Sequence, residues 1–257
     1  GIEPVCQAAI NSIELFRVCQ EDFSSFCSQE KSGTAAGYNC LVRDKKHPSM
    51  SSQCSARITL RDQQIGRDYR VSHGLAKACK DDIKLYHCRR GVSEDKHVRL
   101  AQILLCLESV SKNGTKLAPP CLTELTDHRR MLMTDYQLSP ELLNDCADDI
   151  PKFCPDEHKA QLVNGMTSTG GEIIHCLLEH VKARRPQRRV TAQCQRGLET
   201  LIKASDAGED WRVDPVLRRA CKPVVDVVCR DVQGGEARVM GCLMEHIGTP
   251  VMLPDCE

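Results

Sequence analysis

The chain has 257 residues with 35 basic and 35 acidic side chains, so its formal net charge is zero, and only 4% of its residues are aromatic. Balanced charge argues against a general nucleic-acid-binding protein, which is normally basic, and the shortage of aromatic residues argues against a large aromatic core. The 17 cysteines dominate the composition. Because no C-x₂₋₄-C pair occurs, structural disulfides of the secretory pathway are favoured over zinc modules and C-x-x-C redox motifs.

The chain begins with GIEPVCQAAI, which lacks the basic start and apolar region of a secretory signal peptide. No stretch of 18 apolar residues is present, so no membrane-spanning helix is expected. We therefore expect a mature piece or an excised fragment of a secretory protein. Asn113 opens an Asn-Gly-Thr sequon in a segment typical of an exposed loop, which predicts a glycosylation site.

Sixteen cysteines form four blocks of four, and Cys6 is left over. The first and second cysteines of each block are separated by seven or eight residues, and successive first cysteines are 60, 67 and 75 residues apart. This self-similarity predicts four tandem repeats, which we place at residues 1–66, 67–133, 134–207 and 208–257. The blocks are Cys19, Cys27, Cys40 and Cys54; Cys79, Cys88, Cys106 and Cys121; Cys146, Cys154, Cys176 and Cys194; and Cys221, Cys229, Cys242 and Cys256.

Other residues repeat with the cysteines. A leucine stands four positions before each first cysteine and another directly after each third cysteine. An aspartate follows the first cysteine by three positions in three blocks, where the fourth block has Val224. In three blocks an aromatic residue stands ten positions before the first cysteine and directly follows an aspartate. These aromatic residues are Tyr69, Tyr136 and Trp211.

The apolar spacing around the cysteines predicts an all-α array of disulfide-stapled helical repeats. The first helix of the third block is expected to begin with Ser139 as N-cap and Pro140 at the first helical position, and Asp214 and Pro215 repeat this pattern in the fourth block. Helices around the third cysteine are expected over 94–110 and 170–181, and a longer helix that carries the fourth cysteine over 121–136. Each repeat should therefore contain two short helices and one long connecting helix.

The helical interpretation bears on disulfide pairing. The first and second cysteines of one intact helix would lie about 12 Å apart along its axis, which is too far for a disulfide. If the first two helices form an antiparallel hairpin, the second cysteine faces the third and the fourth returns beside the first. We predict this nested pairing, for example Cys146–Cys194 with Cys154–Cys176. A first-to-third and second-to-fourth pairing remains an alternative, because sequence alone does not fix connectivity.

Candidate catalytic and metal-binding residues are few. The aspartate pairs 81–82 and 148–149 could serve acid–base catalysis, but they recur inside a helical repeat, which favours solvated faces or salt bridges. His175 and His180 are off the i, i+4 spacing of a helical metal pair, and His246 reuses the repeat position of His180. We therefore predict no catalytic residue, no metal and no cofactor.

Two features could form binding surfaces. The repeated aromatic residues could be binding hot spots, although packing of one repeat against the next is favoured. The segment VKARRPQRRV is either a solvated loop or a contact for an acidic partner or a sulfated glycan. Its basic residues are Lys182, Arg184, Arg185, Arg188 and Arg189.

Three segments share spacing and residue types beyond cysteine: RDYRVSHGLAKACKDDIKLYHC, TDYQLSPELLNDCADDIPKFC and EDWRVDPVLRRACKPVVDVVC. They resemble the cysteine-rich repeats of the Golgi apparatus protein 1 family, also called cysteine-rich fibroblast growth factor receptor and E-selectin ligand 1. The resemblance covers essentially the whole chain. The short connection between Cys6 and Cys19 departs from the pattern, so Cys6 is expected to be a remnant of a preceding repeat, with a free thiol or an intermolecular disulfide.

The resemblance implies a luminal fragment of a single-pass glycoprotein of the Golgi membrane and the cell surface. Such a fragment would be a non-enzymatic scaffold that binds growth factors of the fibroblast growth factor class and presents glycans to E-selectin. A saposin-like lipid-binding helical module is the alternative, but the charges on the predicted helices count against continuous apolar faces. A hydrolase would need a nucleophile constellation that the sequence does not offer.

Overall fold

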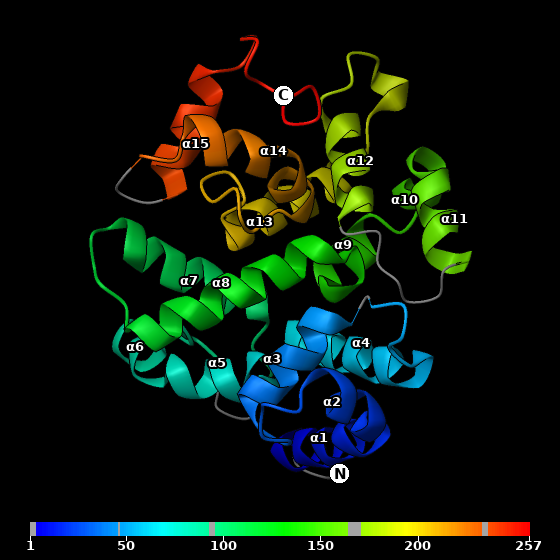
Figure 1. Ribbon diagram of the computed structural model, residues 1–257, viewed down its shortest axis with the longest axis vertical. Coiled ribbons are helices and arrows are strands. Elements are labelled where there is room, and N and C mark those ends of the chain that lie inside the picture. The colour runs from blue at the N-terminus through cyan, green and yellow to red at the C-terminus, as the bar shows by residue number, and fades with distance from the viewer. Residues whose placement is uncertain (1–3, 46, 93–95, 164–170, 233–235) are drawn as a thin grey trace. The chain divides into compact units, whose positions relative to one another are not determined.

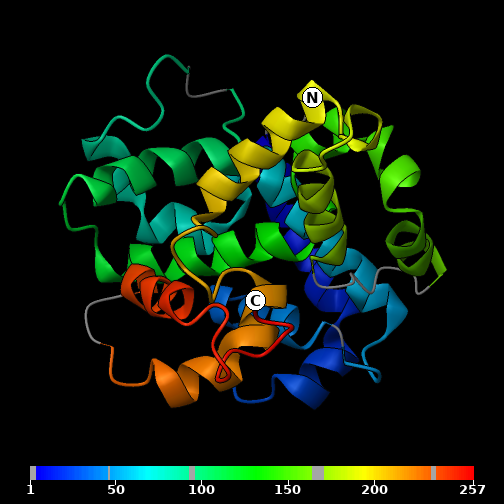
Figure 2. The same ribbon diagram turned by 90° about the horizontal axis from the view of Figure 1, so that it is seen from above.

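The computed structural model describes residues 4–45, 47–92, 96–163, 171–232 and 236–257, and none of these residues lies in a β-strand. Helices joined by loops and short 3₁₀ turns make up the structure (Figures 1 and 2). The predicted all-α class is therefore confirmed. Cys6 lies within the first helix, but its side chain is outside the description, so the predicted state of its thiol stays a prediction.

Each repeat contributes its helices in the same order along the chain. The first repeat contains α1 (Pro4–Val18), α2 (Gln20–Phe26), α3 (Ala35–Asp44) and α4 (Ser52–Arg67). The second contains η1 (Tyr69–Val71), α5 (His73–Ala78), α6 (Lys80–Leu85), α7 (Leu100–Lys112) and α8 (Pro119–Thr134). The third contains η2 (Tyr136–Leu138), α9 (Pro140–Asp145), α10 (Asp149–Phe153), α11 (Pro155–Val163), α12 (Glu172–Val181), η3 (Pro186–Arg188) and α13 (Ala192–Ser205). The fourth contains α14 (Pro215–Val228) and α15 (Glu236–Glu245).

The chain forms two compact units. One unit comprises residues 1–124, 137–140 and 159–168, and the other comprises residues 125–136, 141–158 and 169–257. The predicted repeat boundaries after 66, 133 and 207 lie within two residues of the ends of α4, α8 and α13, and they remain predictions. Within the described residues, no helix combines the length and apolar character that crossing a lipid bilayer requires.

Eight disulfides staple the repeats, and their connectivity is the predicted nested one. In each repeat the outer disulfide joins the first cysteine to the fourth, with Cα atoms 4.5–4.8 Å apart, and the inner disulfide joins the second to the third, with Cα atoms 5.5–6.0 Å apart. The outer disulfides are Cys19–Cys54, Cys79–Cys121, Cys146–Cys194 and Cys221–Cys256, and the inner ones are Cys27–Cys40, Cys88–Cys106, Cys154–Cys176 and Cys229–Cys242.

The prediction of one intact helix between the first and second cysteines is wrong in three repeats. The helix is interrupted at or just after Cys19, Cys79 and Cys146, and only α14 runs unbroken past its first cysteine. The interruption is a kink, since Cys19 still donates to the Leu15 carbonyl at 2.8 Å and the Phe23 N–H to the Cys19 carbonyl at 2.7 Å. At Cys19 the backbone adopts φ −88° and ψ 11°, outside the usual helical values.

The kinks coincide with the aspartate that follows the first cysteine by three positions. The Asp22 carboxylate accepts from the Ser51 N–H at 2.8 Å and from its hydroxyl at 2.6 Å. The Asp149 carboxylate accepts from the Thr191 N–H at 2.9 Å and from its hydroxyl at 2.7 Å. Ser51 and Thr191 are the N-caps of α4 and α13. The fourth repeat has Val224 and no kink, which indicates that these bonds turn the second segment out of line.

The repeated leucines form the centre of each repeat. Those before the first cysteine in the first three repeats are at most 1% exposed, and all those after the third cysteine are at most 5% exposed. The repeated aromatic residues are also buried, which supports packing rather than a role as exposed hot spots. The buried leucines are Leu15, Leu75, Leu142, Leu41, Leu107, Leu177 and Leu243, and the aromatic residues are Tyr69, Tyr136 and Trp211.

Of the predicted helix over 94–110, residues 94 and 95 lie outside the described residues, and α7 begins at Leu100. Residues 96–99 are irregular because their backbone bonds to the η1 turn instead of to itself: the Val98 carbonyl accepts from the Tyr69 N–H at 3.1 Å, and the Lys96 carbonyl accepts from Arg70 Nη2 at 3.2 Å. Val98 is fully buried there. Helix α11 was not predicted from the sequence.

Gly66 tests a close packing contact. It lies inside α4, and a methyl group added to it would collide with the backbone carbonyl of Leu138. Alanine normally stabilises a helix interior relative to glycine, but we expect Gly66→Ala to lower the free energy of unfolding by roughly 1–3 kcal/mol. Gly241, in α15, has open space around it. Gly241→Ala should raise the free energy by about 0.5–1 kcal/mol, and denaturant titration that finds both variants stabilised would contradict the contact.

Candidate partner-binding surfaces

The aspartate pairs proposed as acid–base candidates have a structural use. Asp82 is buried and accepts from the Ala118 N–H at 3.3 Å, one residue before α8 begins, and Asp149 holds the N-terminus of α13. The other member of each pair, Asp81 or Asp148, is exposed. The two carboxylates of a pair therefore do not converge on one cleft, and the absence of catalytic residues remains a prediction.

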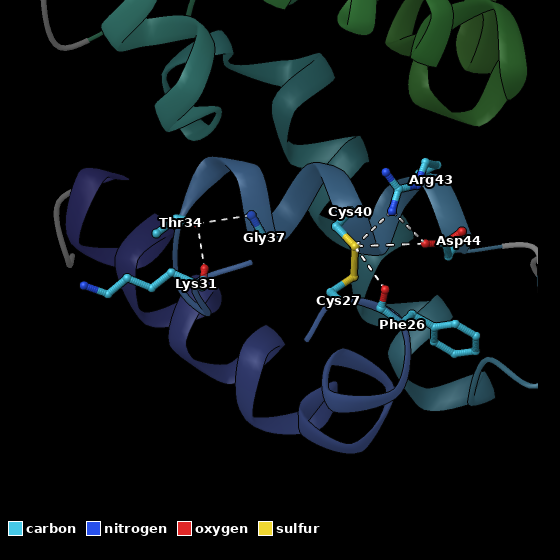
Figure 3. Close-up of a disulfide and its surroundings, with 8 residues drawn as sticks. All are labelled: Phe26, Cys27, Lys31, Thr34, Gly37, Cys40, Arg43 and Asp44. Carbon is cyan, nitrogen blue, oxygen red and sulfur yellow. Dashed lines mark hydrogen bonds and ion pairs between the residues drawn. A yellow bond between two sulfur atoms is a disulfide. The ribbon is translucent and has the colours of Figure 1, made fainter. Parts of the chain in front are cut away.

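The described residues contain three clusters of metal-ligand type, and each includes both cysteines of an inner disulfide. The sulfurs of a disulfide are not the thiolates that bind metal, so these clusters are not metal sites in the oxidised protein. Figure 3 shows the cluster formed by Cys27, Cys40 and Asp44. Arg43 Nη2 lies 3.4 Å from Cys40 Sγ and 3.2 Å from an Asp44 oxygen, so the charge next to this disulfide is internally paired.

The candidate histidines each have a hydrogen-bond partner. His180 Nδ1 donates to the Arg188 carbonyl at 2.9 Å, and His246 Nδ1 donates to the Cys242 carbonyl at 2.8 Å. His175 in α12 has its Nε2 2.7 Å from the Asp214 carboxylate. These contacts fit packing and surface positions, and the absence of a metal site stays a prediction.

The His175–Asp214 pair links two repeats of one unit. Asp214 is the N-cap of α14 and accepts from the N–H groups of Val216 and Leu217. The hydrogen bond to Asp214 raises the pKa of His175 above its ordinary value. Burial alone would raise the pKa of Asp214, but the bonds from His175 and from the helix N-terminus lower it below its ordinary value.

A groove of about 610 Å³ lies between the first two repeats, within one compact unit. Its walls come from α1, from the start of α3 and from the η1–α5 segment, and its apolar lining includes Ile13, Phe16 and Val71. Ile13 is 71% exposed, which is unusual for a large aliphatic side chain beside a groove. An exposed apolar rim around a concavity is typical of a binding site.

The base of the groove holds a polar cluster around Tyr38. The guanidinium of Arg61 lies 5.2 Å from the centre of the Tyr38 ring, its Nη2 donates to the Val71 carbonyl at 3.1 Å, and its buried Nη1 has no partner. Burial lowers the pKa of Arg61. The Tyr38 hydroxyl donates to Asp62, which Lys45 also contacts at 3.4 Å. Burial and this carboxylate raise the pKa of Tyr38 well above its ordinary value.

Ile13, Tyr38 and Arg61 in the groove were not candidates on sequence grounds, because these residues do not repeat between the blocks. One signal was available. Tyr38 stands two positions before the third cysteine, where the other repeats have Leu104, Ile174 and Met240. A single aromatic hydroxyl at an apolar repeat position indicates a local polar cluster.

The basic segment forms an exposed turn around η3. Arg189 closes the turn, since its Nε donates a hydrogen bond to the Ala183 carbonyl at 2.7 Å. His180 holds the other end through the Arg188 carbonyl, and its ring lies 4.9 Å from that of Phe153. The remaining charges form no ion pair within the described part of the chain and face solvent; they belong to Lys182, Arg184, Arg185 and Arg188.

Asn113 is exposed at the C-terminus of α7, and Gly114 and Thr115 of the sequon are exposed in the turn that follows. The acceptor is therefore sterically open to a glycosylating enzyme, and glycosylation itself remains a prediction.

A family model described as a cysteine rich repeat matches residues 52–115, 119–185 and 192–251. The matched segments begin where α4, α8 and α13 begin, so the family's unit starts with the long helix that the predicted unit ends with. The chain is 36% identical over 244 residues to Golgi apparatus protein 1 of Homo sapiens and of Gallus gallus. It is 32% identical over 249 residues to the Golgi apparatus protein 1 homolog of Caenorhabditis elegans.

These matches cover 95% of the chain but only 20–21% of the relatives, so the chain spans about a fifth of their length. No solved structure significantly matches the chain.

Asp149 and its exposed neighbour Asp148 form a matched pair for testing the carboxylate bonds to the N-cap. Asp149→Ala leaves the N–H and hydroxyl of Thr191 without their acceptor, so we expect a loss of roughly 2–3 kcal/mol in the free energy of unfolding. Asp148→Ala should change it by less than about 0.5 kcal/mol. Denaturant titration of both variants gives the comparison, and equal losses would refute the assignment.

The His175–Asp214 pair predicts a pH dependence. The raised pKa of His175 contributes stability that is complete below about pH 6.5 and is lost as the pH rises through the raised value. The lowered pKa of Asp214 contributes stability that is present above about pH 4 and is lost as the pH falls further. The stability difference between the wild type and His175→Gln should therefore be greatest between those limits, and a difference independent of pH would speak against the pair.

Proposed function

Because the chain belongs to the cysteine-rich repeat family, we propose that it is a segment of a luminal, non-enzymatic binding scaffold of the Golgi membrane and the cell surface. The relatives are named as Golgi apparatus proteins. Eight disulfides support an oxidising compartment, since such bonds persist in the secretory pathway and are rare in the cytosol.

Growth factors of the fibroblast growth factor class are the proposed protein partners. The family model is named for a cysteine-rich fibroblast growth factor receptor, which supports this class. A glycan on exposed Asn113 would be the element presented to E-selectin. The basic turn at 182–189 is proposed as an accessory contact for an acidic or sulfated partner.

The groove between the first two repeats is the observation that carries the proposal. It combines exposed Ile13 with half-buried Phe16 and a preorganised Arg61–Tyr38 cluster. Central apolar and aromatic anchors beside a fixed arginine are the residue types that dominate protein–protein binding energy. The disulfides hold the walls of the groove, so little ordering is needed when a partner binds.

Ile13 provides the sharpest test of the groove. We expect Ile13→Asp to weaken binding to immobilised fibroblast growth factors at least tenfold, which is about 1.4 kcal/mol, because an apolar contact is replaced by a charge. Val227 in α14 is 79% exposed and lines no part of the groove, so Val227→Asp is the matched control. Surface plasmon resonance with a panel of these growth factors gives the affinities; equal effects of the two variants, or no binding by the wild type, would overturn the proposal.

The accessory role of the basic turn is tested separately. Neutralising Lys182, Arg184, Arg185 and Arg188 to glutamine leaves Arg189 to hold the turn. Weaker growth-factor binding with a reduced salt dependence would support a contact there, and unchanged binding would exclude it.

A saposin-like lipid-binding function is the alternative, and one feature of the fourth repeat favours it. Four large apolar side chains within ten residues are 43–66% exposed, namely Met244, Ile247, Val251 and Leu253. Co-sedimentation with vesicles of phosphatidylcholine and phosphatidylserine separates the functions. We expect the wild type to stay in the supernatant, and sedimentation that Met244→Asp abolishes would favour the lipid-binding module.

A further inference from the structure

A basic depression lies on the second repeat and shares no lining residue with the groove. Its volume is about 740 Å³, and all of its lining belongs to one compact unit. The described lining contains no acidic residue. The lysine and arginine members are Lys80, Lys84, Arg89 and Arg90, and the others are His87, Tyr69, Ala76, Ile83 and Val92.

Lys80 and Lys84 in helix α6 (Figure 1) follow the i, i+4 spacing of neighbours on a helix surface. His87 lies two residues beyond the end of α6 and lines the same depression. Asp82 lies off this face and is bonded to the Ala118 N–H. Lys80, Lys84, His87 and Arg90 are exposed, and none of these four forms an ion pair among the described residues. Two lysines at i, i+4 repel each other by a few tenths of a kcal/mol, a repulsion that a bound anion would relieve.

The rim of the depression depends on a residue that the other repeats lack. The second repeat has eight residues between its first two cysteines, whereas the others have seven. His87 occupies the left-handed region with φ 53°, where glycine is usual. The Cys88 N–H bonds to the Ile83 carbonyl at 3.0 Å and the His87 N–H to the Lys84 carbonyl at 3.3 Å, which is a Schellman ending of α6.

In the other repeats the second cysteine instead bonds to the carbonyl four residues earlier; the pairs are Cys27 with Phe23, Cys154 with Ile150, and Cys229 with Val225. The extra residue of the second repeat thus supplies an imidazole at the rim in a strained conformation. Non-glycine residues held in this region are concentrated at functional sites.

The fourth repeat provides an internal comparison. The positions of Lys80 and Lys84 are occupied there by Lys222 and Asp226, which form an ion pair at 2.6 Å. The same scaffold positions therefore carry a self-neutralised pair in one repeat and two unpaired cations in another. In the first and third repeats these positions hold no charged residue; they are Gln20 and Ser24, and Ala147 and Pro151.

We propose that this depression binds a sulfate or phosphate ester group carried on a saccharide. Lysine and arginine side chains that line one depression are the groups that bind sulfate and phosphate esters. Buried Ile83 and Tyr69 form an apolar floor on which the carbon face of a sugar ring packs. The site shares no lining residue with the growth-factor groove or with the turn at 182–189.

Binding is measured on the full chain by titration calorimetry with three probes: a heparin-derived hexasaccharide, its desulfated counterpart, and a pentamannose phosphate. The full chain is used because it includes the acidic residues Glu94 and Asp95, which lie close in sequence to the lining residue Val92 and outside the described residues. We expect the first or the third probe to bind and the desulfated one not to bind, and the tighter of the two binders identifies the source of the ester. Binding of the desulfated probe with equal affinity would overturn the proposal.

Variants place the binding on this face. The double variant Lys80→Gln with Lys84→Gln should lose at least tenfold in affinity, whereas Lys222→Gln, and the variant with the turn at 182–189 neutralised, should retain it. Similar losses in all three would indicate non-specific attraction and refute the site.

His87→Gly separates a ligand-binding role from a capping role. Glycine relieves the left-handed conformation, so the variant should unfold at a higher temperature and yet bind the charged probe several-fold more weakly. Unchanged affinity together with raised stability would show that His87 only caps α6, and would remove it from the site; unchanged affinity in the double lysine variant as well would reject the proposal.

Discussion

The outer disulfide is the constraint on which the rest of the structure depends, because it fixes the first turn of a long helix that two repeats share. Cys54 stands in the first turn of α4, where its disulfide and the Asp22–Ser51 bonds secure the helix to the first repeat. The same helix ends at Arg67, directly before the Asp68–Tyr69 turn that opens the second repeat. The outer disulfide Cys19–Cys54 therefore fixes the start of the second repeat through a helix anchored in the first.

The sequence predicted the features that recur. Cysteine spacing and the leucines beside it were sufficient for the helical class and the nested pairing, since each position was visible several times. The kinks at Cys19, Cys79 and Cys146 were not predictable, because their cause is a tertiary bond from an aspartate to a helix N-terminus that the local pattern does not contain. The irregular backbone of residues 96–99 was not predictable for the same reason, because its hydrogen-bond partners belong to η1.

The candidate surfaces were harder to predict than the fold because they reside in the differences between repeats. Tyr38 and Arg61 lie at the base of the groove at positions that are not shared, and an added residue, His87, marks the second repeat. Residues that recur in every repeat are those that the stability of the repeat requires. Residues that line the candidate binding surfaces differ from one repeat to the next. The turn at 182–189 was found only because its charge is dense enough to stand out without comparison.

The nested order of the disulfides also bears on the order in which they can form. A chain that enters an oxidising lumen from its N-terminus presents Cys27 and Cys40 before Cys54. Both sulfurs of the inner disulfide are therefore available before the second sulfur of the outer disulfide. In the folded first repeat the first and second cysteines stay apart, because helical backbone bonds run between them, from the Phe23 N–H to the Cys19 carbonyl and from the Cys27 N–H to the Phe23 carbonyl. Once the inner disulfide has formed, the first cysteine has only the fourth left to pair with inside its repeat, so the nested order leaves the outer disulfide a single partner choice.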